Sequence, residues 1–423
     1  MLIIELITKG IVIYFAFRTI LRKRKMVKKQ SETVDEKNFS IVLGGPFFQL
    51  LRKAHLTGNS LELLKQRIII IALLAWLPLF VLSVIKGQAW GEGSNLPFIE
   101  DLEVHIRFLV AVPLMIIAEM LVHQRIRLVV NEFEERNLIP PGALTSFRNA
   151  ISKAYRLRNS VLAEAFILIL IYVIGYNVIW EKSMAVETTA WFSEPSVGKG
   201  HLSLAGIWFR YVSLPLFQFL FLRWYYRIFI WSRFLFQVSR IKLNLVPSHP
   251  DTMGGLGFLT NVVFAFMPLG LAHGAVMAGM ISNHIFHEGA SLLDFKVLII
   301  IIVVWMLLVV MLPLLFFSSQ LSDAQRTGCL DYGKFASRYV QAFDARMIKG
   351  KITVEESLSH NQEVQGLADL ANSYHVVQKM QILPITRSDI IMLAVITVAP
   401  LLPLMLTMMP LSELIKMLSG VLF

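Results

Sequence analysis

The chain carries little charge and almost no cysteine for its length. Of its 423 residues, only 16% are charged and 56% are hydrophobic, whereas soluble globular domains carry about 25% charged residues. Cys329 is the single cysteine, which excludes an internal disulfide and a cluster of thiolate metal ligands. The sequence also has no nucleophile elbow, phosphate-binding loop or zinc-protease helix. The composition therefore predicts a membrane protein, gives no sign of a cofactor and disfavours an enzyme.

The surplus of basic residues has an explanation other than nucleic-acid binding. The formal net charge is +11, but the basic residues lie in the connections between long apolar stretches. Loops of this kind attract the anionic headgroups of membrane lipids. We expect lipids as partners, consider a homo-oligomer compatible with the sequence, and expect no binding of nucleic acid.

Seven apolar stretches have the 17–25 residues that a helix needs to cross about 30 Å of hydrocarbon. They lie near 68–86, 106–122, 160–180, 204–222, 256–280, 297–317 and 389–409. Residues 1–21 are apolar but contain three charges, so they are either an eighth span or a surface helix. The predicted fold is an all-α polytopic transmembrane bundle. Its parts are an N-terminal region (1–66), spans one to six (67–317), a helical subdomain (318–388), and the last span with its tail (389–423).

The charges of the connections predict the orientation of the bundle. Lys and Arg number thirty-one in the connections 22–67, 123–158, 223–255 and 318–388, and four in the alternate ones. Basic loops stay in the cytoplasm, so residues 22–67 and 318–388 are predicted to be cytoplasmic. We expect the cytoplasmic membrane of a bacterium.

Amphipathic segments flank the spans. Residues 43–53 and 224–238 are predicted to lie in the headgroup layer, the second because it mixes basic with aromatic residues. Apolar spacing at 331–349 and 362–382 predicts two helices packed under the bundle.

Ionisable and polar residues inside the spans are candidate functional residues, because their burial in lipid costs free energy unless they are paired with another group or hydrated. Those toward the outer face are Arg107, Arg210 and His273, and those toward the cytoplasmic face are Glu119, Glu164 and Gln218. They either line a pathway for an anion or protons, or are simply paired. In the second case Arg107 meets Glu100 or Glu103, and the two deep glutamates meet basic residues at the loop ends.

The stretch 245–262 joins a basic aromatic segment to the fifth apolar stretch. Its residues His249, Asp251, Gly254, Gly255 and Gly257 place an acid and three glycines at the start of a helix. A helix N-terminus with free N–H groups can hold an anion. The alternative is a capped turn in which Asp251 or Thr252 caps the helix and the glycines serve packing.

Three further features have simpler alternatives. His284, His287 and Glu288 have the spacing of metal ligands on one helical turn, but interfacial polar residues have the same pattern. Prolines occur in six of the seven predicted spans, which suits a kinked, wet interior or merely reflects how common proline is in membrane helices. Gly270 and Gly274 are predicted to let another helix approach closely.

The run His249-Pro-Asp-x-x-Gly-Gly-Leu-Gly-Phe-Leu259 resembles an uncharacterised family of bacterial multi-pass inner-membrane proteins. Ala75-Trp-Leu-Pro-Leu79, the run 213–219 and the run 367–373 support the resemblance, which would cover most of residues 40–405. The resemblance implies a bacterial membrane and this topology, but no activity.

Three functions are compatible with these residues. The favoured one is a transporter or channel-like protein for a small solute or ion, with a pathway past Arg210, His273 and Glu119. The alternative is a membrane sensor or scaffold that binds an anionic lipid or ligand at His249–Gly257 and signals through 318–388. A membrane-embedded lipid-modifying enzyme that uses His249 and Asp251 as acid and base has the least support.

Overall fold

A computed structural model describes residues 39–54, 63–90, 96–174, 190–193, 201–349 and 361–408. Over these residues the fold is the predicted all-α membrane bundle, with two isolated β-bridges, Leu96–Ala190 and Ser193–Leu202, and no longer strand. The predicted extra span at 1–21 and the outer tail from residue 409 lie outside this part of the chain.

Six helical segments are long and apolar enough to cross a membrane, which makes this a multi-pass membrane protein. They are Leu64–Ile85, Leu102–Glu135, Leu204–Val238, Gly257–Glu288, Leu292–Arg346 and Arg387–Met405. The predicted span at 160–180 is described only as the shorter apolar helix α7 (Val161–Ile174). Large apolar side chains such as Ile300, Ile301 and Trp305 lie exposed along α12 (Lys296–Met311), as expected of a helix that faces lipid.

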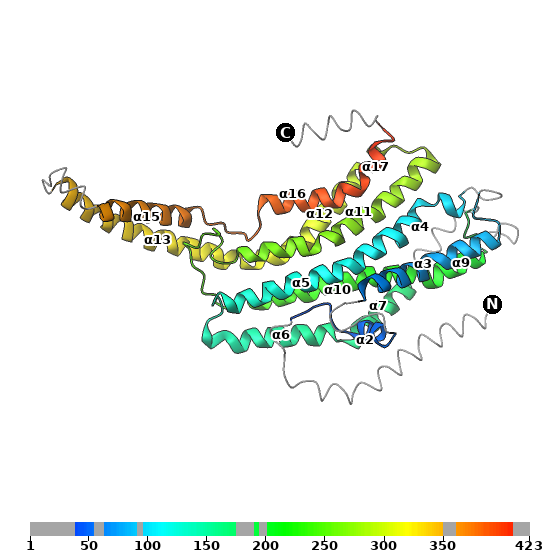
Figure 1. Cartoon of the computed structure of the whole chain (residues 1–423), viewed down its shortest axis with the longest axis horizontal. Coiled ribbons are helices and arrows are strands. Elements are labelled where there is room, and N and C mark those ends of the chain that lie inside the picture. Colours follow the sequence, from blue (N-terminus) through cyan, green and yellow to red (C-terminus); the bar gives the residue numbers. More distant parts are fainter. Residues whose placement is uncertain are drawn as a thin grey trace.

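One helix forms the centre of the bundle. α11 (Asn261–Glu288) packs against α5 (Val112–Glu135) on one side, and against α12 and α16 (Arg387–Val398) on the other. It is 72% buried over its most apolar window, against 28–44% for the other five segments. α10 (Leu214–Val238) packs against α6 (Leu144–Arg158), α7 and α5 (Figure 1). The remaining bundle helices are α3 (Leu64–Ile85), α4 (Leu102–Ile106), α9 (Leu204–Trp208) and α17 (Leu402–Met405).

The prolines change the helical hydrogen-bonding pattern in four of the long segments. Pro113 and Pro215 each follow a π-helical turn, Arg107–Ala111 and Phe209–Ser213. The turns Leu312–Phe317 and Ala399–Leu401, which contain Pro313 and Pro400, are 3₁₀. Proline lacks the N–H that would close the regular turn, so the backbone adopts wider or tighter turns there. Pro78 and Pro268 lie inside continuous α-helices.

The segment 224–238 is not the surface helix that its composition predicts. It continues the membrane-spanning helix as part of α10, and Trp224, Ile228, Trp231 and Phe234 are all buried in it. The shorter segment at 43–53 is the amphipathic α2 (Pro46–Lys53), with Phe48 and Leu51 buried.

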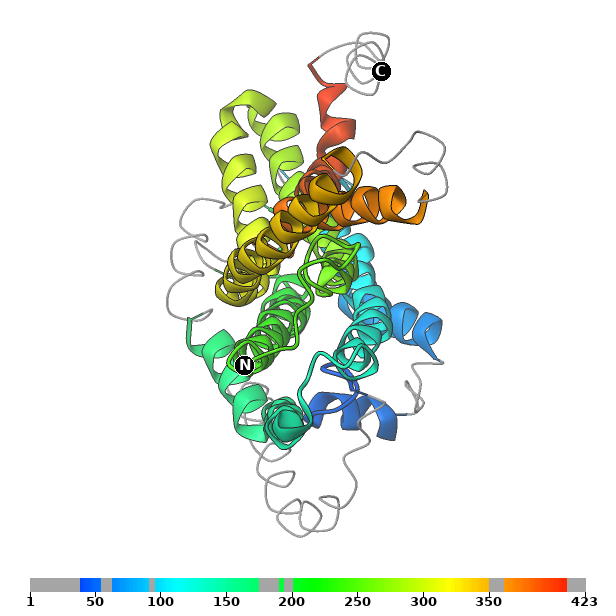
Figure 2. The same ribbon diagram turned by 90° about the vertical axis from the view of Figure 1, so that its left-hand side faces the viewer.

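The two predicted helices of residues 318–388 are present, but they do not lie under the bundle. α13 (Ser318–Phe343) continues from α12 without a loop, and α15 (Asn361–Gln378) packs back along it. The pair extends beyond the ends of α5, α6 and α10 (Figures 1 and 2). Because an unbroken helix connects this hairpin to the bundle, its direction follows that of α12.

The two glycines of α11 permit close helix contact, as predicted. A Cβ on Gly270 would lie 2.9 Å from Oγ1 of Thr397, and one on Gly274 would lie 1.9 Å from the carbonyl oxygen of the same residue. The backbones of α11 and α16 therefore approach to a distance that only glycine allows at Gly274.

We predict that Gly274→Ala destabilises the protein by about 1–3 kcal/mol, the usual effect of overpacking, because backbone atoms must move apart. Gly142→Ala is the control, since a Cβ there has no neighbour within 4 Å. Thermal unfolding of both variants in the same detergent checks this. Equal melting temperatures for the two variants would contradict the close approach.

Candidate functional site

Glu119 on α5 lies at the centre of a buried charge cluster. Its Oε2 is 2.8 Å from Nη2 of Arg67 on α3, and its Oε1 is 2.8 Å from Nη1 of Arg227 on α10. Nη1 of Arg223, also on α10, donates to Oε1 at 3.4 Å. The four side chains are between 1% and 6% exposed. A single carboxylate thus binds three arginines that come from two other helices.

Glu164 at the start of α7 extends the cluster. Its Oε1 accepts a hydrogen bond from Nε of Arg223 at 3.2 Å. Its Oε2 accepts one from the backbone N–H of Phe47, in the first turn of α2, at 2.7 Å. Gly45, with φ +88°, packs on the same carboxylate, because a Cβ there would lie 2.9 Å from Oε1. α2 is therefore held on the bundle by a charge-assisted hydrogen bond as well as by its apolar face.

The cluster lies at one level of the membrane-spanning helices. At about 1.5 Å per residue, Glu119 is about 26 Å from the start of its segment at Leu102, and Arg223 is about 29 Å from Leu204. Arg67 is about 27 Å from the opposite end of α3 at Ile85. Since the hydrocarbon is about 30 Å thick, the cluster lies at its edge, on the side that the basic loops predict to be cytoplasmic.

The charges of the cluster do not balance. Three arginines face two glutamates, which leaves one excess positive charge in a buried environment. Nε and Nη1 of Arg67 and Nη2 of Arg227 have no hydrogen-bond partner among the residues that the structure describes. The contact between Arg67 Nη2 and Glu119 is an ion pair in distance only, because its angle does not meet hydrogen-bond geometry. Buried donors without partners cost about 1–3 kcal/mol each, and more when charged.

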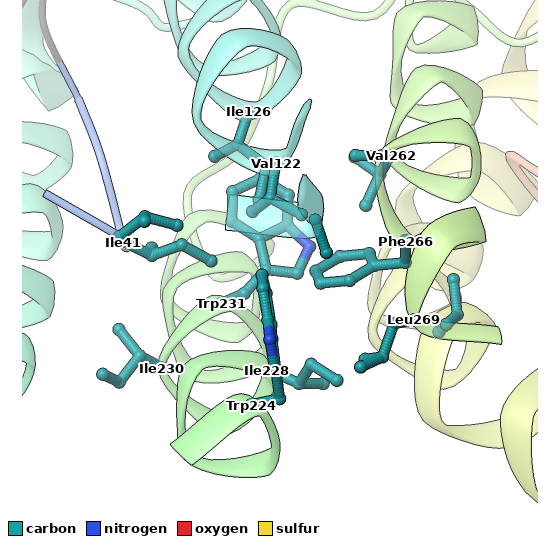
Figure 3. Packing of buried hydrophobic residues seen from close by; sticks show 14 of the residues in the cluster. Ile41, Val122, Ile126, Trp224, Ile228, Ile230, Trp231, Val262, Phe266 and Leu269 are labelled. Atoms are coloured by element: carbon teal, nitrogen blue, oxygen red, sulfur yellow. The ribbon is translucent and has the colours of Figure 1, made fainter. Parts of the chain in front are cut away.

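Apolar side chains pack beside the cluster. Figure 3 shows Val122 of α5, Trp224 and Ile228 of α10, and Phe266 of α11 meeting between the three helices. The indole N–H of Trp224 donates to the carbonyl of Met115 at 3.0 Å. The Trp224 ring also lies under the guanidinium of Arg227, 4.8 Å from ring centre to Cζ. Packing of this kind excludes water, so the charges interact at a low local dielectric constant.

Three predicted site residues on α10 and in the two π turns lie away from the cluster. Arg107 forms an ion pair with Glu103, one of its two predicted partners, and its Cζ is 5.5 Å from the Phe217 ring centre. Arg210 stacks on Tyr211 at 5.4 Å. Gln218 is partly buried on α10.

His273 makes its hydrogen bonds outside the cluster, in a chain with Leu269, Tyr225 and Trp305. Its Nδ1 lies 2.7 Å from the carbonyl oxygen of Leu269, and its Nε2 lies 2.7 Å from the hydroxyl of Tyr225. That hydroxyl accepts from the indole N–H of Trp305 at 2.9 Å. The carbonyl needs a donor, so Nδ1 carries the proton and Nε2 accepts from Tyr225. A neutral imidazole satisfies this chain, and the arrangement does not bring His273, Arg210 and Glu119 into contact.

At the junction stretch, the Asp251 carboxylate satisfies the backbone itself. Oδ1 accepts from the N–H groups of Met253 at 2.8 Å and Gly255 at 3.1 Å, and Oδ2 accepts from Gly257 at 2.8 Å. Burial alone raises the pKa of Asp251, but these donors and His249 together hold that pKa below its ordinary value. Asp251 therefore closes the turn before the helix, as the second alternative predicts, but the N-cap positions are Leu256 and Thr260 and have no side-chain cap. The three backbone donors are already used.

The junction connects the bundle to the hairpin. The N–H of Gln381, after α15, donates to the carbonyl of Thr252 at 2.7 Å, and the hydroxyl of Tyr332 on α13 donates to Ser248 at 2.8 Å. Gly254, at φ +63°, would place a Cβ 2.9 Å from Cε of Met380. The glycine serves both the turn and this close packing.

The predicted metal ligands His284, His287 and Glu288 contact different partners. Nδ1 of His284 is 2.8 Å from Oε2 of Glu288, whereas Nε2 of His287 lies 3.3 Å from the carbonyl of Glu100. The residues that the structure describes contain no group of three or more His, Cys, Asp or Glu side chains placed to hold a metal ion. The alternative explanation, interfacial polar residues, fits this geometry.

Arg67, Arg223 and Arg227 are not among the predicted site residues, because in the sequence they belong to the basic connections between spans. One expectation from the sequence pointed to them, namely that the deep glutamates pair with basic residues at the loop ends. The structure confirms that pairing. Without these three, the charge count still stands at twenty-eight against four, so the predicted orientation is unaffected.

Comparisons with family models, curated proteins and solved structures found no match to this chain. The resemblance of the His249–Leu259 run to a bacterial membrane family stays a prediction, and the site is interpreted from its own geometry.

We predict that Glu119→Gln destabilises the protein by about 3–5 kcal/mol, the usual cost of removing one partner from a buried ion pair, because three arginines then lack this carboxylate. Glu132→Gln on the same helix is the control. Its partner is Arg136 one turn away on a part-exposed face, and such pairs contribute at most about 1 kcal/mol. Thermal unfolding in detergent measures both. A second variant, Glu119→Gln with Arg67→Met, is expected to recover part of the loss.

For the junction we predict a pH-dependent effect. Because the pKa of Asp251 is lowered in the folded state, its contribution to stability is present above about pH 4 and is lost as the pH falls through the folded-state pKa. Asp251→Asn is therefore expected to lower the melting temperature at pH 7 and to flatten its fall below pH 4. A melting curve that keeps the wild-type dependence on pH would contradict this role.

Proposed function

We propose that the protein is a transporter or channel-like protein for a small solute or ion. Its binding site in this proposal is the Glu119 cluster, which consists of Glu119, Glu164, Arg67, Arg223 and Arg227. The observation that carries this proposal is the cluster itself. Five ionisable side chains from four helices meet in the buried interior of the bundle, at the edge of the hydrocarbon. Groups placed there are costly, and in membrane proteins they mark substrate and ion pathways.

The excess charge supports this assignment more than the unpartnered atoms do, because buried atoms outside the cluster, such as Nε of Arg107 and Nδ1 of His123, also lack a partner among the described residues. Arg107 is paired with Glu103, and His273 has partners for both ring nitrogens. Asp101, buried near the start of α4, accepts from Val104, Trp191 and Asn283. The cluster combines an uncompensated charge with unpartnered donors. An anionic ligand would therefore gain more binding free energy at the cluster than at these other groups.

The test is flux from liposomes that contain the purified protein, with and without a membrane potential. Arg223→Lys is the informative variant, because it keeps the charge but loses the fork that reaches both Glu119 and Glu164. We expect it to lower flux at least tenfold. Arg136→Lys, which changes an arginine on the part-exposed end of α5, is expected to retain wild-type flux.

Two results of the flux measurement would count against the proposal. A wild-type preparation that is folded, reconstituted in both orientations and silent toward ions and small anions would count against transport. Equal flux in wild type and Arg223→Lys would remove the cluster from the pathway.

A second candidate, a sensor or scaffold, is favoured by one observation. The junction stretch hydrogen-bonds directly to α13 and to Gln381, three residues after α15, so a change at the bundle would reach the hairpin. Hydrogen exchange of α13 and α15 in wild type and Asp251→Ala tests it. Unchanged protection of the hairpin would count against coupling through the junction.

A further inference from the structure

The excess charge of the Glu119 cluster has no counterion within the described protein. Arg67 and Arg227 each contact one oxygen of the same carboxylate, and Glu164 is already shared between Arg223 and the N–H of Phe47. Arginine stays protonated in proteins, so the cluster cannot lose the charge by releasing a proton. Water would satisfy the free N–H donors but would not neutralise the charge.

The free donors are guanidinium N–H groups in buried positions. Arg67 is 1% exposed and Arg227 is 4% exposed. Within the described part of the chain, the atoms without a hydrogen-bond partner are Nε, Nη1 and Nη2 of Arg67 and Nη2 of Arg227. Guanidinium presents its donors in a planar fork that matches the oxygens of phosphate and carboxylate, whereas lysine acts as a point charge. All three cations of this cluster are arginines, and that composition suits an oxyanion.

We infer that this cluster binds a phosphate group, which contacts Arg67 and Arg227 and neutralises the excess charge. Phosphate would be the substrate class of the proposed binding site, so this inference rests on the proposed function. A phosphate group reaches this level of the membrane from two sources, as free inorganic phosphate or as the headgroup of an anionic lipid at the hydrocarbon edge. The chemistry at the arginines is the same for both.

The first arm of the test uses free phosphate. The full chain, in a maltoside detergent without phosphate, is titrated with sodium phosphate at constant ionic strength, with sodium chloride as the reference. Isothermal titration calorimetry measures binding, and the melting temperature should rise with phosphate because a ligand of the folded state stabilises it. We expect saturable binding of phosphate but not of chloride.

The second arm uses lipid. Native mass spectrometry of the protein in bilayer nanodiscs that contain phosphatidylglycerol shows whether an anionic lipid stays bound after delipidating washes. Retention in wild type, with displacement by added phosphate, would identify the headgroup as the occupant. Binding in the first arm without retained lipid would identify the free anion.

Three variants connect the binding to the arginines. Arg67→Met removes the excess charge and leaves Glu119 paired with Arg223 and Arg227, and we expect at least tenfold weaker binding. Arg67→Lys keeps the charge but not the fork, so its affinity should fall between those of Arg67→Met and wild type, and it serves if Arg67→Met does not fold. Arg136→Met is the matched control outside the cluster and should bind as wild type does.

Two results would overturn the inference. One is a wild type that binds phosphate in neither arm, and the other is binding that is equal in wild type and all Arg67 variants. Flux without phosphate binding would reject the substrate class and leave transport standing. Phosphate binding without flux would retain the site and reject transport.

Discussion

The carboxylate of Glu119 is the constraint on which the helix arrangement depends. Apolar side chains such as Val122 and Phe266 favour burial but tolerate many relative positions of the helices, because the hydrophobic effect is not directional. An ion pair is specific in position, and here one carboxylate fixes α3 and α10 against α5 at a single level. Through Arg223 and Glu164 the same constraint reaches α7 and α2. Breaking it would leave charges that the surrounding packing cannot solvate.

The chain treats its buried polar groups in two ways. At the opposite end of the helices Asp101 has three donors, and His273, which bonds Tyr225 between Arg223 and Arg227 in the sequence of α10, is bonded on both nitrogens. Such saturated groups hold the fold together and have little left to offer a ligand. The Glu119 cluster keeps an unbalanced charge and free guanidinium nitrogens. Buried atoms elsewhere, such as Nε of Arg107 and Nδ1 of His123, also lack partners in the part of the chain that the structure describes, so it is the excess charge that distinguishes the cluster and supports the proposed ligand site.

The sequence predicted the helical bundle and the two acids of the site, but not its arginines. Spans are predictable because hydrocarbon thickness sets their length, so the apolar stretches near 68–86 and 256–280 stand out. The same method ends a span where basic residues begin, and so it assigned Arg223 and Arg227 to a loop although α10 continues to Val238. Whether an arginine beyond an apolar run snorkels or turns inward depends on which carboxylate a neighbouring helix presents. Only the three-dimensional arrangement supplies that information, as it does for Asp251, whose capping role and ligand role look alike in sequence.

The π turns of the two long parallel segments account for how the cluster can form. The segments begin at Leu102 and Leu204, and Pro113 and Pro215 lie eleven residues after these starts, each preceded by a five-residue π turn. A π turn accommodates one extra residue, and in an α-helix one residue corresponds to about 100° of rotation. Each turn therefore rotates the following half of its helix relative to the first half. Glu119 lies in the rotated half of one segment, and Arg223 and Arg227 lie in that of the other. Without the two π turns, Glu119, Arg223 and Arg227 would point away from their present directions about the helix axes. The π turns before Pro113 and Pro215 therefore help to bring these charged side chains together.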